Sequence, residues 1–126
     1  MSELLEAVEN NNIKKVRELL KAGADINFQG KNGYSALCIS IVNPKSKKIS
    51  KLLIDSGADI NVVTSCEITP LYLAVEISNL EIFKLLLEKG ANPNTQDCFG
   101  ESLLHEAVRE YSNAVDEIKK LIKKNL

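Results

Sequence analysis

Gly23-Ala24-Asp25-Ile26-Asn27 occurs three times in this chain with small changes, and the fold follows from that recurrence. The later copies are Gly57-Ala58-Asp59-Ile60-Asn61 and Gly90-Ala91-Asn92-Pro93-Asn94, so the period is about 33 to 34 residues. A period of this length is typical of solenoids, in which each repeat is one small unit that stacks on its neighbours. The phrase therefore predicts a one-dimensional stack of repeats.

Each copy of the phrase follows an apolar helix end, and its glycine suits the left-handed residue that ends a helix. Upstream, a hydroxyl residue that can cap the start of a helix recurs in one column, at Ser2, Ser35, Thr69 and Ser102. Small and apolar residues follow on one helix face, in the columns Leu4, Leu37, Leu71, Leu104 and Ala7, Ser40, Ala74, Ala107. Each unit is thus predicted to hold two antiparallel helices and a projecting turn.

The third unit, with Thr69-Pro70-Leu71-Tyr72-Leu73-Ala74 and Leu85-Leu86-Leu87-Glu88-Lys89-Gly90-Ala91-Asn92-Pro93-Asn94, resembles the ankyrin repeat. The resemblance covers the whole chain and implies an all-α ankyrin-repeat solenoid of helix-turn-helix units with β-hairpin turns. We expect a single domain over residues 1-126, with repeats at about 1-31, 32-65, 66-98 and 99-126. An extra residue near Asn43-Pro44 and about two in the fourth repeat loosen these boundaries.

Charged residues replace apolar ones at both ends of the predicted stack. The columns read Glu6, Ile39, Leu73, Glu106; then Lys15, Ile49, Ile82, Glu117; then Glu18, Leu52, Leu85, Lys120. A terminal repeat has one face in water, so this pattern predicts a self-capped, complete domain of four repeats that is a monomer.

Composition argues against several partners. The formal charge is -1, which gives no positive field for nucleic acid or an anionic membrane. No apolar stretch approaches the roughly 18 residues of a membrane span, and the N-terminus lacks the pattern of a secretory signal. We therefore expect a cytoplasmic protein that binds neither nucleic acid nor membrane, with non-Sec secretion into a host cell as the alternative.

The candidate chemical groups are few. His105 is the only histidine, and the resemblance implies a structural role for it, although an enzyme centred on His105 stays open as an alternative. The three cysteines are Cys38, Cys66 and Cys98, which we interpret as reduced thiols. Cys66 and Cys98 lie in adjacent columns of successive turns, so a redox or disulfide role is the alternative. Without clustered ligands or a phosphate loop, we expect no metal, no cofactor and no catalysis.

The resemblance also implies where a partner protein binds, namely the concave face formed by turn tips and the exposed ends of first helices. The predicted binding residues are Lys31, Asn32, Tyr34, Val42, Ile68, Glu76, Ile77, Phe99, Glu101 and Arg109. Five of them are apolar or aromatic where solubility alone favours polar residues, and aromatic side chains ringed by polar ones are typical of interfaces. Tyr34 and Phe99 are the expected anchors, whereas Val42 and Ile77 could equally pack against a neighbouring repeat.

Three aromatic residues, Phe28, Tyr72 and Phe83, are predicted to lie in the core or between repeats and not in the binding site. The predicted function is non-catalytic protein recognition by a rigid, preorganised surface. The many Asn, Lys and Ile residues leave open a host-directed microbial effector that also acts by binding protein. The resemblance further implies that Asn27, Asn61 and Asn94 match the spacing of ankyrin asparagines that are hydroxylated in animal cells.

Overall fold

The computed structural model describes residues 2–93, 109–110, 116, 119–120 and 123. Its described part holds six α-helices and one short 3-10 helix, η1 (Lys31–Gly33). The first helices of the units are α1 (Glu3–Glu9), α3 (Ala36–Val42) and α5 (Pro70–Glu76). The second helices are α2 (Ile13–Lys21), α4 (Lys47–Asp55) and α6 (Leu80–Glu88). The all-α solenoid predicted from the sequence is confirmed.

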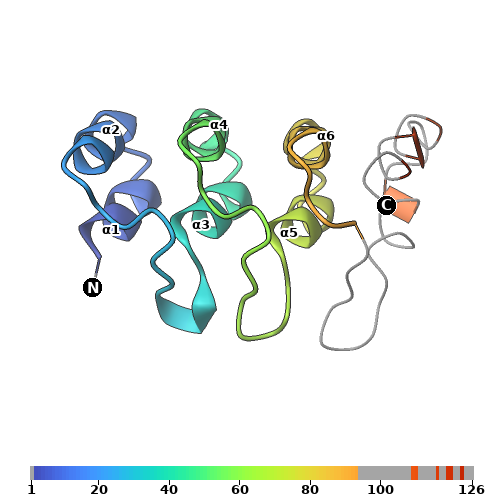
Figure 1. The fold of residues 1–126 in the computed structure, drawn as a ribbon, viewed down its shortest axis with the longest axis horizontal. Coiled ribbons are helices and arrows are strands. Elements are labelled where there is room, and N and C mark those ends of the chain that lie inside the picture. Colours follow the sequence, from blue (N-terminus) through green and yellow to red (C-terminus); the bar gives the residue numbers. More distant parts are fainter. Residues whose placement is uncertain (1, 94–108, 111–115, 117–118, 121–122, 124–126) are drawn as a thin grey trace.

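The helix pairs stack side by side, with the second helices in one row and the first helices in another (Figure 1). Each first helix contacts the first helix of the next unit, and each second helix contacts the next second helix. The loops that follow α2 and α4 project to the same side (Figure 1). This arrangement repeats the same contacts from unit to unit, as a solenoid requires.

The helix starts are set by side-chain caps. Ser35 Oγ accepts a hydrogen bond from the Cys38 N–H, and Thr69 Oγ1 accepts one from the Tyr72 N–H, whereas the Ser2 hydroxyl makes no such bond. Two of the second helices use asparagine instead: Asn12 Oδ1 accepts a hydrogen bond from the Lys15 N–H, and Asn79 Oδ1 accepts one from the Ile82 N–H. Helix α4 begins after Ser46, whose side chain makes no capping bond. The asparagine caps were not predicted, although Asn at these positions is a known signal for a helix start.

The predicted hairpins are short turns, and residues 2–93 contain no β-strand. The Gly30 N–H donates to the Tyr34 carbonyl at 2.9 Å, and the Thr64 N–H donates to the Ile68 carbonyl at 3.0 Å. A single closing bond of this kind orders a turn without extending into a ladder. The turns gain further order from one another, since both the N–H and the hydroxyl of Ser65 donate to the Asn32 carbonyl.

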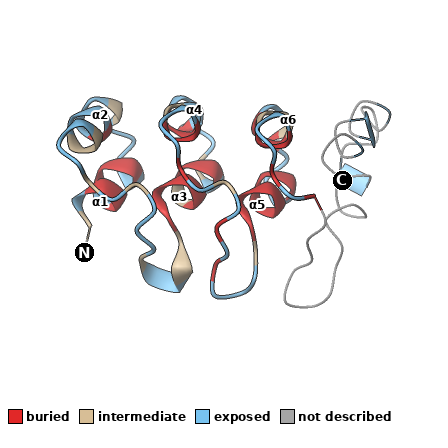
Figure 2. Ribbon diagram, in the orientation of Figure 1, coloured by how far each residue is buried: buried red, intermediate tan, exposed pale blue. Residues whose placement is uncertain are grey.

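The core runs along the whole described stack, between the two rows of helices (Figure 2). Leu4, Leu37 and Leu71, the predicted first-helix column, are each at most 1% exposed. Tyr72 and Phe83 are also buried, as predicted, but Phe28 is 41% exposed, so its assignment to the core was wrong. Phe28 lies in the first projecting turn, and the described residues include no earlier turn to cover it. Val62, at the same position one unit later, is buried.

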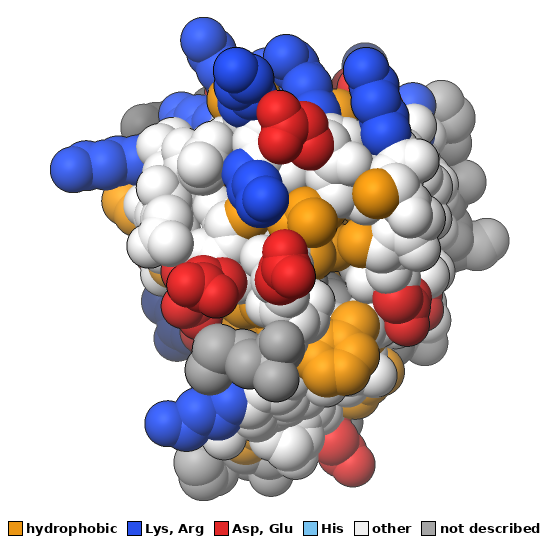
Figure 3. All heavy atoms as spheres, turned by 90° about the vertical axis from the view of Figure 1, so that its left-hand side faces the viewer, with side chains coloured by type: hydrophobic (Ala, Val, Ile, Leu, Met, Phe, Trp, Pro, Cys, Tyr) orange, Lys and Arg blue, Asp and Glu red, His pale blue; other side chains and the backbone are white. Residues whose placement is uncertain are grey.

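The capping columns behave as predicted at the start of the stack. Glu6, Lys15 and Glu18 are exposed in the first unit, whereas Leu73 and Ile82 are buried in the third. Figure 3 looks onto the N-terminal end and shows acidic and basic side chains around a small apolar group. In the fourth unit, Glu106 and Glu117 lie outside the described residues and Lys120 is exposed.

One cysteine prediction is corrected. Cys66 is disulfide-bonded, so its interpretation as a reduced thiol was wrong, while Cys38 is a free thiol in the core. Cys98 lies outside the described residues. Bonding of a thiol depends on which side chain the fold places beside it, and the composition does not reveal this.

Candidate protein-binding surface

Helix α3 presents only apolar side chains to solvent. Its sequence, ALCISIV, contains no charged residue, and five of its seven residues are buried. The two remaining residues are Ile39, which is half-buried, and Val42, which is 37% exposed. They stand three positions apart and therefore share one helix face. Helix α1, by contrast, exposes Glu3, Glu6 and Glu9.

A hollow of about 450 Å³ lies between the first projecting turn and helices α1 and α3; we call it the turn hollow. It is lined by Leu5, Glu9, Phe28, Gly30, Lys31, Asn32, Tyr34 and Ile39. Three predicted site residues, Lys31, Asn32 and Tyr34, come together here. Phe28 and Ile39 were not among the predicted site residues. For Phe28 the sequence did hold a signal: in its column a side chain is buried only by a preceding turn, and the first repeat has no preceding turn among the described residues.

A second hollow of about 440 Å³ lies where α3 and α5 end; we call it the helix-end hollow. It is lined by Val42, Pro44, Lys47, Ile77, Ser78, Asn79, Leu80 and Glu81. Val42 and Ile77, which the sequence placed either in the site or against a neighbouring repeat, are each 37% exposed here. Exposed aliphatic side chains paired across a repeat junction are available for contact with another molecule.

Helix α3 contributes Ile39, at its middle, to the turn hollow and Val42, its last residue, to the helix-end hollow. Along a helix the rise is about 1.5 Å per residue, so these two residues are roughly 4.5 Å apart along the axis of α3. We call the lining of both hollows, together with Ile39 and Val42, the α3 surface. It crosses from the first repeat junction to the second.

The other predicted site residues lie apart from these hollows or outside the described part of the chain. Ile68 is half-buried and packs against the core, so it is a supporting residue. Glu76 and Arg109 are exposed on helical backbone. Phe99 and Glu101 lie outside the described residues, as does His105.

Negative charge lies near the α3 surface. Burial, and after it the nearby Cys38 and Glu76 groups, raise the pKa of the Tyr34 phenol above its usual value. Tyr34 is therefore a neutral hydrogen-bonding group throughout the physiological pH range.

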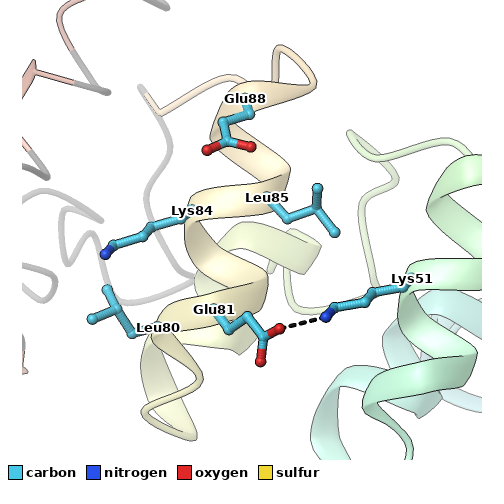
Figure 4. A pocket seen from close by; sticks show the side chains of 6 residues that line it. All are labelled: Lys51, Leu80, Glu81, Lys84, Leu85 and Glu88. Carbon is cyan, nitrogen blue, oxygen red and sulfur yellow. Dashed lines mark hydrogen bonds and ion pairs between the residues drawn. The ribbon is translucent and has the colours of Figure 1, made fainter.

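A third hollow, of about 470 Å³, has a different character. It lies between α4 and α6 and is lined by Lys51, Leu80, Glu81, Lys84, Leu85 and Glu88 (Figure 4). Lys51 forms an ion pair with Glu81, and that hydrogen bond lowers the pKa of the Glu81 carboxyl. An exposed, paired carboxylate of this kind is poorly suited to acid–base catalysis, which needs a group near its operating pH.

The described residues include no group of three His, Cys, Asp or Glu side chains placed to hold a metal ion. Every helix described is also too short to cross a bilayer. What the described surface offers is an apolar strip with polar and charged edges.

These features define a helical-repeat protein with an exposed apolar strip. The chain belongs to the ankyrin repeat family, since the model for ankyrin repeats in three copies matches residues 4–97 and 43–126. Members of this family are generally non-enzymatic modules for protein–protein interaction.

Three relatives illustrate the range of the similarity. The chain is 39% identical over 122 residues to putative ankyrin repeat protein FPV031 of fowlpox virus, covering 95% of this chain and 36% of the relative. It is 35% identical to putative ankyrin repeat protein L371 of Acanthamoeba polyphaga mimivirus, covering 81% of this chain and 13% of the relative. It is 33% identical to putative E3 ubiquitin-protein ligase XBAT34 of Arabidopsis thaliana, covering 91% of this chain and 31% of the relative. The chain thus spans about a third or less of these relatives.

Proposed function

We propose that this chain binds another protein through the α3 surface, without catalysing a reaction. The observation that carries the proposal is the pair of hollows joined by a helix edge that exposes only Ile39 and Val42. Apolar and aromatic side chains with a polar rim are the usual composition of an interface centre. Phe28 and Tyr34 supply the aromatic groups at one end of this surface.

The surface is held in place before binding. The Gln29 side chain donates to the Gly33 carbonyl at 2.8 Å and to the Val63 carbonyl at 2.9 Å, which ties the first turn to the second. Ser46 Oγ donates to Asn11 Oδ1 at 3.1 Å, which ties the helix–helix turns of the first two units. Bonds between units keep the two hollows in a fixed relation, so little ordering entropy is lost when a partner binds.

Affinity capture from lysate of the producing cell, with quantitative mass spectrometry, tests this proposal. The informative variant is Val42→Asp/Ile77→Asp, because both side chains are exposed and their replacement leaves the core intact. The matched control is Val63→Asp, since Val63 is 51% exposed and lines neither hollow. We expect a protein retained by wild type and control but lost from the double variant. Equal retention by all three proteins would place the binding surface elsewhere.

The host-directed alternative concerns where the protein acts, and it stays a prediction. Relatives come from viruses, a bacterium such as Rickettsia felis and a plant, so their sources favour no single cellular setting. Fractionation of infected or colonised host cells distinguishes the two settings. Finding the chain only inside its producing cells would contradict the host-directed alternative.

A further inference from the structure

Successive projecting turns are joined by hydrogen bonds along their facing edges. Asn61 Oδ1 of the second turn accepts a bond from the Asn92 N–H at 3.0 Å. Three further bonds join the first turn to the second: Asp59 N–H to Asn27 Oδ1 at 2.7 Å, Ser65 N–H to the Asn32 carbonyl at 3.0 Å, and Gln29 Nε2 to the Val63 carbonyl at 2.9 Å. The second turn therefore uses two backbone N–H groups and one carbonyl to bind the turn before it.

The first turn presents the same three backbone groups to solvent. One repeat earlier in the sequence, the corresponding groups are the N–H groups of Asp25 and Lys31 and the carbonyl of Gln29. Within residues 2–93, no hydrogen bond is formed by any of these three groups, and all three residues are exposed. A row of open N–H and carbonyl groups is a ready template for pairing with another chain.

An aromatic side chain accompanies these open groups. Phe28 is 41% exposed, whereas Val62, which holds the same position one repeat later, is only 6% exposed. Phe28 also lines the turn hollow, so the open edge continues into an apolar depression. We call the backbone groups of Asp25, Gln29 and Lys31, together with Phe28, the turn edge.

The helices at the same end of the stack are finished differently. Glu6, Lys15 and Glu18 are exposed there, in columns that are apolar in the next two units. A whole helical unit stacked on this end would bury these charges, which is costly without partners for them. A single loop that covers only the turn edge leaves the three charges in water, so the charge pattern favours a loop as the occupant.

We propose that the turn edge binds a loop of a partner protein, which lies along the first turn as the first turn lies along the second. The loop supplies oxygen acceptors to the Asp25 and Lys31 N–H groups, one of them the side chain of an Asn or Asp. It also supplies a donor to the Gln29 carbonyl and an apolar side chain over Phe28. Main-chain pairing of this kind provides affinity, and the side-chain contacts provide specificity. The inference goes beyond the proposed function, because this contact does not need the helix-end hollow.

The test begins with a phage-displayed library of disulfide-closed loop peptides, selected on immobilised wild-type protein and counter-selected on Phe28→Asp. Because the Phe28 side chain is exposed, the substitution leaves the described core intact, which circular dichroism checks. A synthetic peptide of an enriched sequence is measured by calorimetry, and its affinity is expected to fall at least about tenfold for Phe28→Asp. The matched control is Val63→Asp, an exposed apolar residue of the second turn, which is expected to bind as wild type does.

Amide hydrogen exchange, followed by NMR, then reports on the backbone groups themselves. In the free protein, the Asp25 and Lys31 amides are expected to exchange faster than those of Asp59 and Ser65, which are hydrogen-bonded. Added peptide is expected to slow exchange at Asp25 and Lys31 at least about tenfold and to leave Asp59 and Ser65 unchanged. A merely apolar contact with Phe28 would not produce this pattern.

Peptides that bind Phe28→Asp as tightly as wild type, or that leave exchange at Asp25 and Lys31 unchanged, would overturn the inference. A library that yields no peptide selective for wild type would do the same. Concentration-dependent assembly of the protein alone, abolished by Phe28→Asp, would assign the turn edge to a second copy and also overturn the proposed occupant. The peptide is expected to bind Val42→Asp/Ile77→Asp as tightly as wild type, so failure at the turn edge is distinguishable from failure of the proposed function.

Discussion

The side chain of Asn27 accepts a hydrogen bond of 2.7 Å from the backbone N–H of Asp59, and so joins the first projecting turn to the second. Asn61 repeats this bond to the N–H of Asn92 at 3.0 Å. Asn27 and Asn61 therefore link units in series, while Asn94, the third residue of the column, lies outside the described residues. The predicted hydroxylation of these asparagines stays a prediction.

Loss of this link is expected to weaken the stack. Replacing Asn27 with Ala removes one hydrogen bond between units and is expected to lower the free energy of unfolding by about 1 kcal/mol in urea titrations. Asn10→Ala is the control, because Asn10 is equally exposed and its side chain makes no hydrogen bond between units. If Asn27→Ala and Asn10→Ala lower the free energy of unfolding equally, the hydrogen bond between units contributes nothing measurable to stability.

A buried hydroxyl pair in the second unit is expected to be energetically coupled. Ser50 Oγ donates to Ser40 Oγ at 2.8 Å, and both residues are 1% exposed. Ser50→Ala is expected to cost about 1 to 2 kcal/mol, because it leaves part of the bonding capacity of Ser40 unused in the core. The double variant Ser40→Ala/Ser50→Ala should cost less than the sum of the single variants. Strict additivity in a double-mutant cycle would contradict the coupling.

Gly33 is expected to tolerate substitution worse than Gly23. Both glycines have positive φ, at 75° and 90°, but a methyl group on Gly33 would lie 2.8 Å from the backbone nitrogen of Ser65, whereas one on Gly23 would meet nothing within 4 Å. We expect Gly23→Ala to cost about 1 kcal/mol from backbone strain alone. Gly33→Ala should cost at least about 1 kcal/mol more, since the second turn has to shift. Matching thermal unfolding curves for the two variants would show that the turns are not packed together.

Stability is expected to fall at alkaline pH because of Cys38. Burial raises the pKa of its thiol, so the folded state holds the proton more tightly than the unfolded state does. The stability that the protonated Cys38 thiol contributes is fully present below the unfolded pKa of about 8.5, and it is lost as pH rises through the higher folded pKa. Urea unfolding between pH 7.5 and 10 should therefore show a decline for wild type that is smaller for Cys38→Ala. Parallel pH profiles for the two proteins would rule out Cys38 as the source.

The sequence predicts the features of this fold that repeat within each unit. The leucine column, the hydroxyl caps at Ser35 and Thr69 and the positive φ of the glycines that end the second helices all depend on local spacing. Exposure of Phe28 depends instead on what the neighbouring unit places against it, and bonding of Cys66 depends on which side chain the fold brings beside it. The hydroxyl pair of Ser40 and Ser50 escaped prediction for the same reason, since it joins two helices whose relative rotation a sequence does not state.

The candidate surface divides in the same way. Tyr34, Val42 and Ile77 could be named from their columns, because turn tips and helix ends face outward in every unit. Ile39 could not, because its column predicts an apolar residue packed between repeats, and Ile39 is only half-buried where the turn hollow opens. A position in a repeat therefore predicts which way a side chain points better than it predicts what covers it.

Site-specific photo-cross-linking in the producing cell tests directly whether a partner protein binds at the α3 surface. Benzoylphenylalanine is introduced at Val42 on the α3 surface and, as a control, at the exposed Lys48 on α4. We expect a cross-link between position 42 and another protein, and no such product from position 48. Equal cross-linking from both positions, or from position 48 alone, would contradict the claim that this chain binds its partner through the α3 surface.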